Sequence, residues 1–192
     1  MTPRDLIQNA IVPAYKLLPR QMSSPEATCQ SVAIALQESR ILHRRQLINT
    51  DDGPKPLGPA MGFWQFEKMG GVVEVLTSPK TKQMALGVCE AREIKPTTTA
   101  VWWGLSRDDV LAAAFARLLL WIHRNPLPRL NCREDEAWDY YISMWRPGKP
   151  HRETWNQFLY TARAATKEYY EGILPVDNAP AVFGPVGVLA KP

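Results

Sequence analysis

The chain has little cysteine and little histidine, with three residues of each among 192. Cys29, Cys89 and Cys132 lie far apart, and no Cys-x-x-Cys or Cys/His spacing typical of a zinc site occurs. We therefore expect thiols that are mostly buried and reduced, and no metal site. The glycine-containing stretches "GGV" and "GPVG" lack both a preceding strand and the Gly-Lys-Ser/Thr of a phosphate loop, so we expect no cofactor.

Long apolar runs are also lacking, which argues against insertion into a membrane. The first ten residues, "MTPRDLIQNA", have neither the basic nor the apolar region of a secretory signal. The net charge is only +4, and the basic residues are scattered without interleaved aromatic residues. This pattern does not favour a nucleic-acid partner.

What the sequence does contain is typical of a globular protein, with 45% hydrophobic and 22% charged residues. Helical patterns follow one another without the βαβ alternation of a parallel sheet, so the sequence predicts a mainly α fold. We expect one domain over residues 1–172 and an extended C-terminal tail over 173–192, where the periodicity ends.

Capping residues and helix-breaking prolines indicate where the helices begin and end. Thr2 begins the first, which Pro13 should kink or end. Ser23 or Ser24 begins a second that reaches Glu38, and Ser106 with Asp109 begins an apolar helix at the centre of the core. Further helices are expected over 70–78, 80–92, 133–145 and 152–172, whereas 47–66 and 93–104 are expected to be loops, turns or short extended pieces.

The stretch "IALQESR" is chemically unusual because its apolar helix ends in Glu38 and Ser39. A carboxyl group at such a position is partly buried, and burial raises its pKa by penalising the charged form. A glutamic acid that stays protonated near neutral pH can act as a general acid. The alternative interpretation is a capping or surface glutamate.

A second segment, "AMGFWQF" at 60–66, follows after a loop. Together, "ALQESR" and this segment resemble the lytic transglycosylases and goose-type lysozymes, in which a helix ending in Glu-Ser precedes an "A-x-G-L-M-Q" segment. Gly62 and Gln65 match the family's positions, and Trp64 replaces the usual methionine. The third family segment has its only counterpart in "AWDYYISMW", which keeps Tyr140 and Tyr141 but lacks the usual Tyr-Asn-Ala-Gly.

The resemblance implies a lysozyme-like domain with a small loop or β element after the catalytic helix, and it implies cleavage of peptidoglycan. Glu38 would be the catalytic acid, and Ser39 would fix the local geometry. Trp64 and Gln65 would line the saccharide groove, and Tyr140 or Tyr141 would hydrogen-bond near Glu38. Trp145 is the other tryptophan expected to contact sugar, because of its neighbours.

The number of carboxylates distinguishes two mechanisms. An ordinary glycosidase needs two, whereas a lytic transglycosylase needs one because a hydroxyl of the substrate's own muramic acid attacks. We expect lytic transglycosylation with Glu38 as the sole acid and base. A hydrolysing muramidase would instead use Glu38 with Asp51 or Asp52, although the composition around these aspartates favours a turn.

The resemblance also suggests where the protein works. A short peptidoglycan-cleaving chain without a visible signal resembles a phage product, present in the virion or in the host cytoplasm before release, and acting at the bacterial cell wall. Its partners would be the glycan strands and phage virion proteins. A third alternative, of another class, is a virion structural or wall-binding protein with little catalytic activity.

Overall fold

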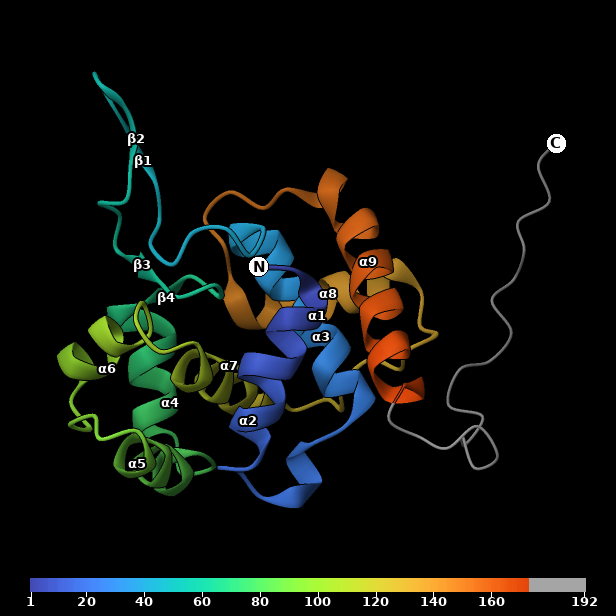
Figure 1. Cartoon of the computed structure of the whole chain (residues 1–192), viewed down its shortest axis with the longest axis horizontal. Helices are drawn as coiled ribbons and strands as arrows, with labels where there is room; N and C mark the ends of the chain where they lie inside the picture. The colour runs from blue at the N-terminus through green and yellow to red at the C-terminus, as the bar shows by residue number, and fades with distance from the viewer. Residues whose placement is uncertain (173–192) are drawn as a thin grey trace, which may run out of the picture.

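A computed structural model of the chain describes residues 1–172 (Figure 1). The predicted tail at 173–192 lies outside the described residues. Within 1–172 the fold is mainly α with two small antiparallel β elements, as the sequence predicts, and the β elements follow the helix that carries Glu38. None of the helices described is both long and apolar enough to cross a membrane.

The N-terminal helical segment consists of α1 (Pro3–Leu6), the π-helical η1 (Ile7–Ile11) and α2 (Val12–Tyr15). Thr2 and Asp5 form the predicted capping box. Pro13 was expected to kink or end this segment; the helical backbone continues through Pro13 and ends at Tyr15, and the wider η1 turn directly precedes α2.

Helix α3 (Pro25–Ser39) follows the short 3₁₀ helix η2 (Arg20–Met22), and its N-cap is Ser24, whose Oγ accepts a hydrogen bond from the backbone N–H of Ala27. After α3 come two hairpins, β1 (Ile48–Thr50) with β2 (Gly53–Lys55), and β3 (Ala60–Met61) with β4 (Phe66–Glu67). The β1–β2 hairpin projects away from the helices (Figure 1).

The remaining elements are η3 (Lys68–Val72), α4 (Val73–Thr77), α5 (Lys82–Ala91), α6 (Thr98–Gly104), α7 (Asp109–Ile122), α8 (Glu134–Trp145) and α9 (Arg152–Glu171). Helix α6 corrects the prediction of a loop at 93–104. Thr97 caps it by accepting from the backbone N–H of Ala100, and Val101 anchors it in the core. Helix α7 begins after Asp108, which caps it in place of the expected Ser106.

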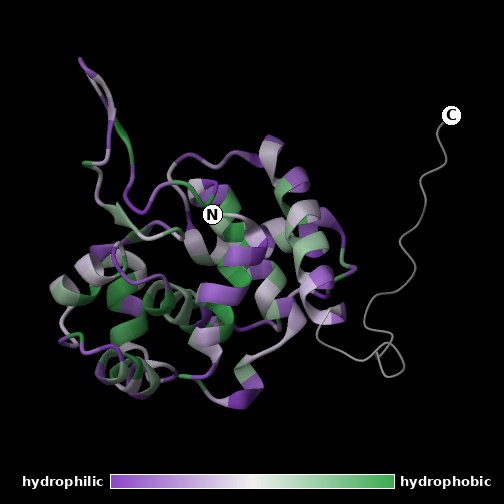
Figure 2. Ribbon diagram, in the orientation of Figure 1, coloured by the Kyte–Doolittle hydropathy of each residue, from purple (hydrophilic) through white to green (hydrophobic). Residues whose placement is uncertain are grey.

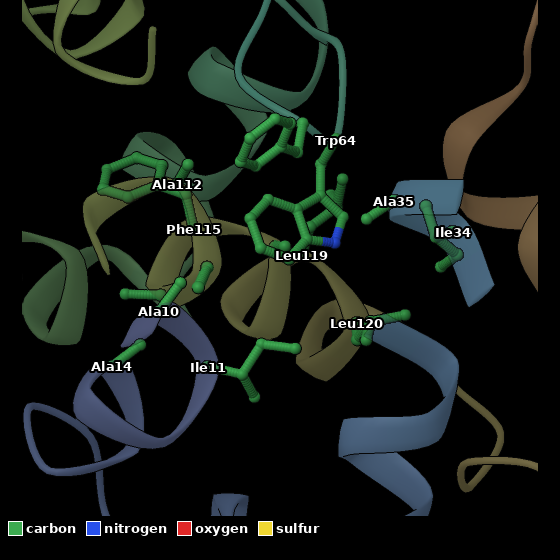
Figure 3. Packing of buried hydrophobic residues seen from close by; sticks show 14 of the residues in the cluster. Ala10, Ile11, Ala14, Ile34, Ala35, Trp64, Ala112, Phe115, Leu119 and Leu120 are labelled. Atoms are coloured by element: carbon green, nitrogen blue, oxygen red, sulfur yellow. The ribbon is translucent and has the colours of Figure 1, made fainter. Parts of the chain in front are cut away.

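The core surrounds α7, whose residues from Leu111 to Leu120 are all buried. Apolar side chains of α2, α3 and the β3–β4 segment meet α7 from several sides (Figure 3). The hydropathy colouring shows the same arrangement, with the green apolar segments turned inward and the purple polar ones outward (Figure 2). Helix α9 packs along α3, and α3 also contacts α7.

Candidate functional site

Glu38 occupies the last turn of α3, and the helix stops directly after it. Arg40 and Ile41 both adopt left-handed backbone conformations, with φ of 54° and 57°. A β-branched residue rarely adopts this conformation, and such strain costs about 1–3 kcal/mol. Burial of the Ile41 side chain, which is 1% exposed, helps to offset this cost. The helix end that presents Glu38 is therefore strained and is held in place by packing.

Ser39 joins this helix end to the second motif segment. Its Oγ donates to the backbone oxygen of Phe63 at 2.8 Å and accepts from the backbone N–H of Ile41 at 3.2 Å. The side chain is buried. Ser39 therefore fixes local geometry, as the family resemblance implies, and it does not offer its hydroxyl to a substrate.

The second motif segment requires glycine at position 62. The backbone of Gly62 has a φ of +74°, and a Cβ placed there would lie 2.8 Å from the backbone oxygen of Leu105. Gln65 also has a positive φ, of 50°, and its Nε2 donates to the backbone oxygen of Gly62 at 2.8 Å. This compact turn brings Gln65 to the same cavity as Glu38.

Glu38 faces two adjoining cavities of about 410 and 440 Å³. The first cavity is lined by the β3–β4 segment with Gln65 and Glu67, and by the 146–151 loop with Lys149 and His151. The second cavity continues past Glu38 toward Arg45 and Phe158. Because Glu38, Gln37, Gln46, Gln65 and His151 line both, the two cavities form a groove with Glu38 in its middle.

The environment of Glu38 sets its protonation. Burial raises the pKa of the Glu38 carboxyl from its ordinary value of 4.5 to about 7, and the nearby charge of Glu67 adds to this rise. A hydrogen bond from the Tyr141 hydroxyl to Glu38 Oε1, at 2.6 Å, acts in the opposite direction by stabilising the carboxylate. Glu38 can therefore both release and take up a proton near neutral pH.

Arg40 does not oppose this rise in pKa. Its guanidinium lies over the ring of Phe158, with Cζ 5.9 Å from the ring centroid, and makes no ion pair with Glu38 among the described residues. This agrees with the rule that residues two apart on a helix point in different directions.

Tyr141 is held by aromatic neighbours. Its ring stacks on Trp155 with centroids 5.1 Å apart and an interplanar angle of 12°, and it contacts Trp138 at 5.3 Å. The predicted tyrosine at Glu38 is thus Tyr141. The expectation that Tyr140 contacts the substrate or Glu38 was wrong. Its hydroxyl donates to the backbone oxygen of Leu120 on α7, and Tyr140 lines neither cavity of the groove.

The structure also corrects the position of Trp64. Its side chain is 0% exposed, and Nε1 donates to the backbone oxygen of Ser31 at 2.9 Å. In Figure 3 its indole lies among Ala35, Phe115 and Leu119, inside the core. Trp64 therefore cannot line the groove. Trp145 does line it, half-buried, and its Nε1 donates to the backbone oxygen of Trp64 at 2.8 Å.

The aspartates considered as a second catalytic group lie elsewhere. Asp51 and Asp52 form the turn of the β1–β2 hairpin, and Asp52 pairs with Lys55 at 2.6 Å. Neither aspartate lines the groove. The groove carboxylates that the sequence reasoning missed are Glu67, which directly follows the second motif segment, and Glu153, which lines the second cavity.

The 146–151 loop is the other part of the groove that the sequence reasoning missed. The stretch "RPGKP" indicates only that a helix stops, yet the loop contributes Arg146, Lys149 and His151 to the groove. Gln37 fixes its far end by donating to the backbone oxygen of His151 at 2.9 Å. The signal in the sequence that could have indicated this part of the groove is the presence of basic residues next to the Pro-Gly pair that stops the helix.

Within residues 1–172, no group of three or more His, Cys, Asp and Glu side chains is placed to hold a metal ion. Comparison with family models, with curated proteins and with solved structures gave no match. The family resemblance of the two motif segments therefore rests on their residues alone.

Proposed function

We propose that this protein cleaves the glycan strand of peptidoglycan between N-acetylmuramic acid and N-acetylglucosamine, by lytic transglycosylation with Glu38 as the only acid and base. The observation that carries the proposal is a carboxyl group of pKa about 7 in the middle of a groove that continues on both sides of it. A strand-cleaving enzyme needs this arrangement, because sugars must bind on both sides of the bond that breaks.

The chemistry requires Glu38 in both protonation states. Protonated Glu38 donates its proton to the glycosidic oxygen as the bond from that oxygen to muramic C1 breaks. The resulting carboxylate accepts a hydrogen bond from Tyr141, and it then takes the proton of the muramic hydroxyl that attacks C1. The product carries an anhydro-muramyl end, Glu38 regains its proton, and no water is consumed.

The charges along the groove favour a strand that carries peptide stems. Besides Glu38, the first cavity has the cations Arg146 and Lys149 against the single carboxylate of Glu67. The second has Arg40 and Arg45 against the single carboxylate of Glu153. Peptide stems carry carboxylates, so an excess of cations along the groove is complementary to peptidoglycan rather than to an uncharged polysaccharide.

A second candidate function is hydrolysis by a muramidase. The specific observation that favours it is Glu67, which lines the same cavity as Glu38 and acts on its pKa. Glu67 would then serve as the nucleophile or as the base that activates water. Asp51 and Asp52 no longer supply this role, because they lie in the hairpin turn outside the groove.

The test is digestion of purified peptidoglycan with the parent and with Glu38→Gln, followed by mass spectrometry of the soluble fragments. Anhydro-muramyl ends support transglycosylation, and reducing ends support hydrolysis. Glu38→Gln should lower the rate by about 10² to 10⁴, the usual contribution of a general acid–base group. The matched control is Glu90→Gln, an exposed glutamate of α5 outside the groove, which should cleave like the parent.

Two outcomes would contradict this proposal. If Glu38→Gln releases fragments as fast as the parent, Glu38 is not the acid. If the folded parent releases none from several wall types but still sediments with them, the protein is a wall-binding module. Association with phage virion proteins is a further part of the prediction, and pull-down with virion proteins tests it separately.

A further inference from the structure

A separate cavity of about 590 Å³ lies at the other end of α3. It is bounded by the chain around η2 and the start of α3, by the end of α7, and by the loop that follows α7. Residues 24 and 38 are separated by 14 positions of α3, which corresponds to about 21 Å along a helix axis at about 1.5 Å per residue. None of the residues that line the catalytic groove lines this cavity.

Arg117, on the central helix α7, is the unusual feature of this cavity. It lines the cavity, yet the residue is only 2% exposed. Its Nε donates to the backbone oxygen of Met22 at 2.6 Å, and its Cζ lies 5.1 Å from the ring centroid of Trp121. Its Nη1 is buried and has no hydrogen-bond partner among the described residues.

The charge of Arg117 has no counter-ion within residues 1–172, because no aspartate or glutamate there forms an ion pair with it. Burial lowers its pKa, and the groups that act against this are the phenols of Tyr15 and Tyr140. A buried charge is normally paired, because removing it from water costs several kcal/mol. A water molecule would satisfy the free N–H but not the charge.

The rest of the cavity is suited to binding a counter-ion that comes from outside the chain. Lys80 and Arg124 are exposed at its rim, and no aspartate or glutamate of the described residues lines it. Lys80 Nζ donates to the backbone oxygen of Ile122 at 3.0 Å, which holds the ammonium group beside the end of α7. Three cations therefore converge on one cavity without an acidic residue.

We propose that this cavity binds an oxyanion, a phosphate or carboxylate group of a ligand, with Arg117 as the buried anchor and Lys80 and Arg124 at the rim. A guanidinium suits this role because its planar fork donates two parallel hydrogen bonds to such a group. The bond to Met22 and the contact with Trp121 fix the fork before the ligand arrives, so little side-chain freedom is lost on binding. This binding is independent of cleavage in the groove.

The test is a titration of the ¹⁵N-labelled full chain with sodium phosphate, with sodium acetate and, as a reference, with sodium chloride at equal ionic strength. The Arg117 Nε–H and Trp121 indole resonances report the site directly. Saturable shifts of both with phosphate identify a phosphate ligand, and with acetate alone a carboxylate ligand. Shifts no larger than those caused by chloride in both arms would overturn the proposal.

Variants then separate a specific site from general attraction of anions. Lys80→Gln with Arg124→Gln should weaken binding at least about ten-fold, the usual effect of losing charged hydrogen bonds. The matched control is Lys16→Gln with Lys95→Gln, which removes the same charge at exposed positions outside the cavity and should leave the affinity unchanged. Equal weakening by both pairs, or by neither, would overturn the proposal.

Arg117→Met tests the anchor itself, with circular dichroism to verify folding. A folded Arg117→Met that has lost anion binding supports the proposal, and one that binds like the parent overturns it. The rim variants decide the matter if Arg117→Met does not fold. Glu38→Gln should bind the anion as the parent does, because Glu38 does not line the cavity.

Discussion

The hydroxyl oxygen of Tyr141 lies 2.6 Å from Oε1 of Glu38, although 103 positions of sequence separate the two residues. The hydroxyl donates, so it stabilises the charged form of a carboxyl group that burial would otherwise keep protonated. Because Trp138 and Trp155 both pack against the tyrosine ring and against each other, this donor is fixed before a substrate binds.

The raised pKa of Glu38 predicts a loss of stability as the pH rises. Between pH 4.5 and about 7, the folded protein retains a proton that the unfolded chain releases. The stabilisation is fully present below pH 4.5 and is lost above about 7, and the shift corresponds to roughly 3 kcal/mol. Glu38→Gln cannot titrate, so its stability relative to the parent should rise by that order between these pH values. Urea unfolding at pH 4.5 and pH 8 measures this, and a constant difference would contradict it.

Tyr141→Phe should move the pH dependence of cleavage. Removing the hydroxyl removes the interaction that lowers the pKa of Glu38, so the alkaline limb of the pH–rate profile should shift to higher pH by about one unit. Tyr140→Phe is the matched control, since it loses a hydrogen bond to Leu120 at a cost of about 1 kcal/mol of stability. The alkaline limb of the Tyr140→Phe profile should lie at the same pH as that of the parent. An unshifted limb in Tyr141→Phe would mean that the contact does not tune the acid.

Asp51→Asn combined with Asp52→Asn should leave the rate of cleavage near that of the parent. Both aspartates belong to the exposed β1–β2 turn, and Asp52 pairs with Lys55 instead of facing the groove. The measurement is fragment release at pH 6, with mass spectrometry of the ends. A collapse of the rate in the folded double variant would show that the hairpin moves over the groove in the complex.

Glu67→Gln distinguishes one catalytic carboxylate from two. If the substrate supplies the nucleophile, this variant should cleave at nearly the parental rate below pH 6. Its alkaline limb should move to lower pH, because the charge of Glu67 raises the pKa of Glu38. Loss of most of the rate at every pH, with reducing ends released by the parent, would assign hydrolysis to the Glu38–Glu67 pair.

Trp64→Phe should lower stability without changing specificity for the substrate. The change removes the indole N–H that donates to the backbone oxygen of Ser31 and replaces a fully buried ring by a smaller one, at a cost of about 1–3 kcal/mol. Urea unfolding measures this loss, and the rate per folded molecule should be that of the parent. Trp103→Phe, at a position that is 39% exposed, should cost less than Trp64→Phe. If the variant had normal stability but bound muropeptides more weakly, Trp64 would contact the substrate in the groove, and this prediction would be wrong.

The helices with strong caps and long apolar stripes were predictable from sequence, because those features act within a few residues of each other. Ser24 and the buried run of α7 are examples. Helix α6 was missed because Pro96 and three consecutive threonines obscure a short apolar face. The π turn before Pro13 was missed because it depends on which i−5 carbonyl is available, and composition does not reveal that.

The candidate site was predictable where a residue's role depends on its neighbours in sequence, and not where it depends on packing. Glu38 and Gln65 are in the groove as expected, since a helix end and a tight turn determine their directions. The choice between Tyr140 and Tyr141 depends on how α8 is rotated against α7, and that rotation is set by contacts distant in sequence. Trp64 is apolar and adjacent to a groove residue, and only its packing shows that it faces the core.

The hydrogen bond from Ser39 to the backbone of Phe63 has a consequence for how this protein can vary. The helix that carries Glu38 and the turn that carries Gln65 are fastened to each other directly, and the β1–β2 hairpin lies between them in sequence without lining the groove. The hairpin can therefore be shortened, lengthened or exchanged while Glu38 and Gln65 keep their relative positions. The hairpin is accordingly the natural position for grafting a wall-targeting peptide onto this scaffold.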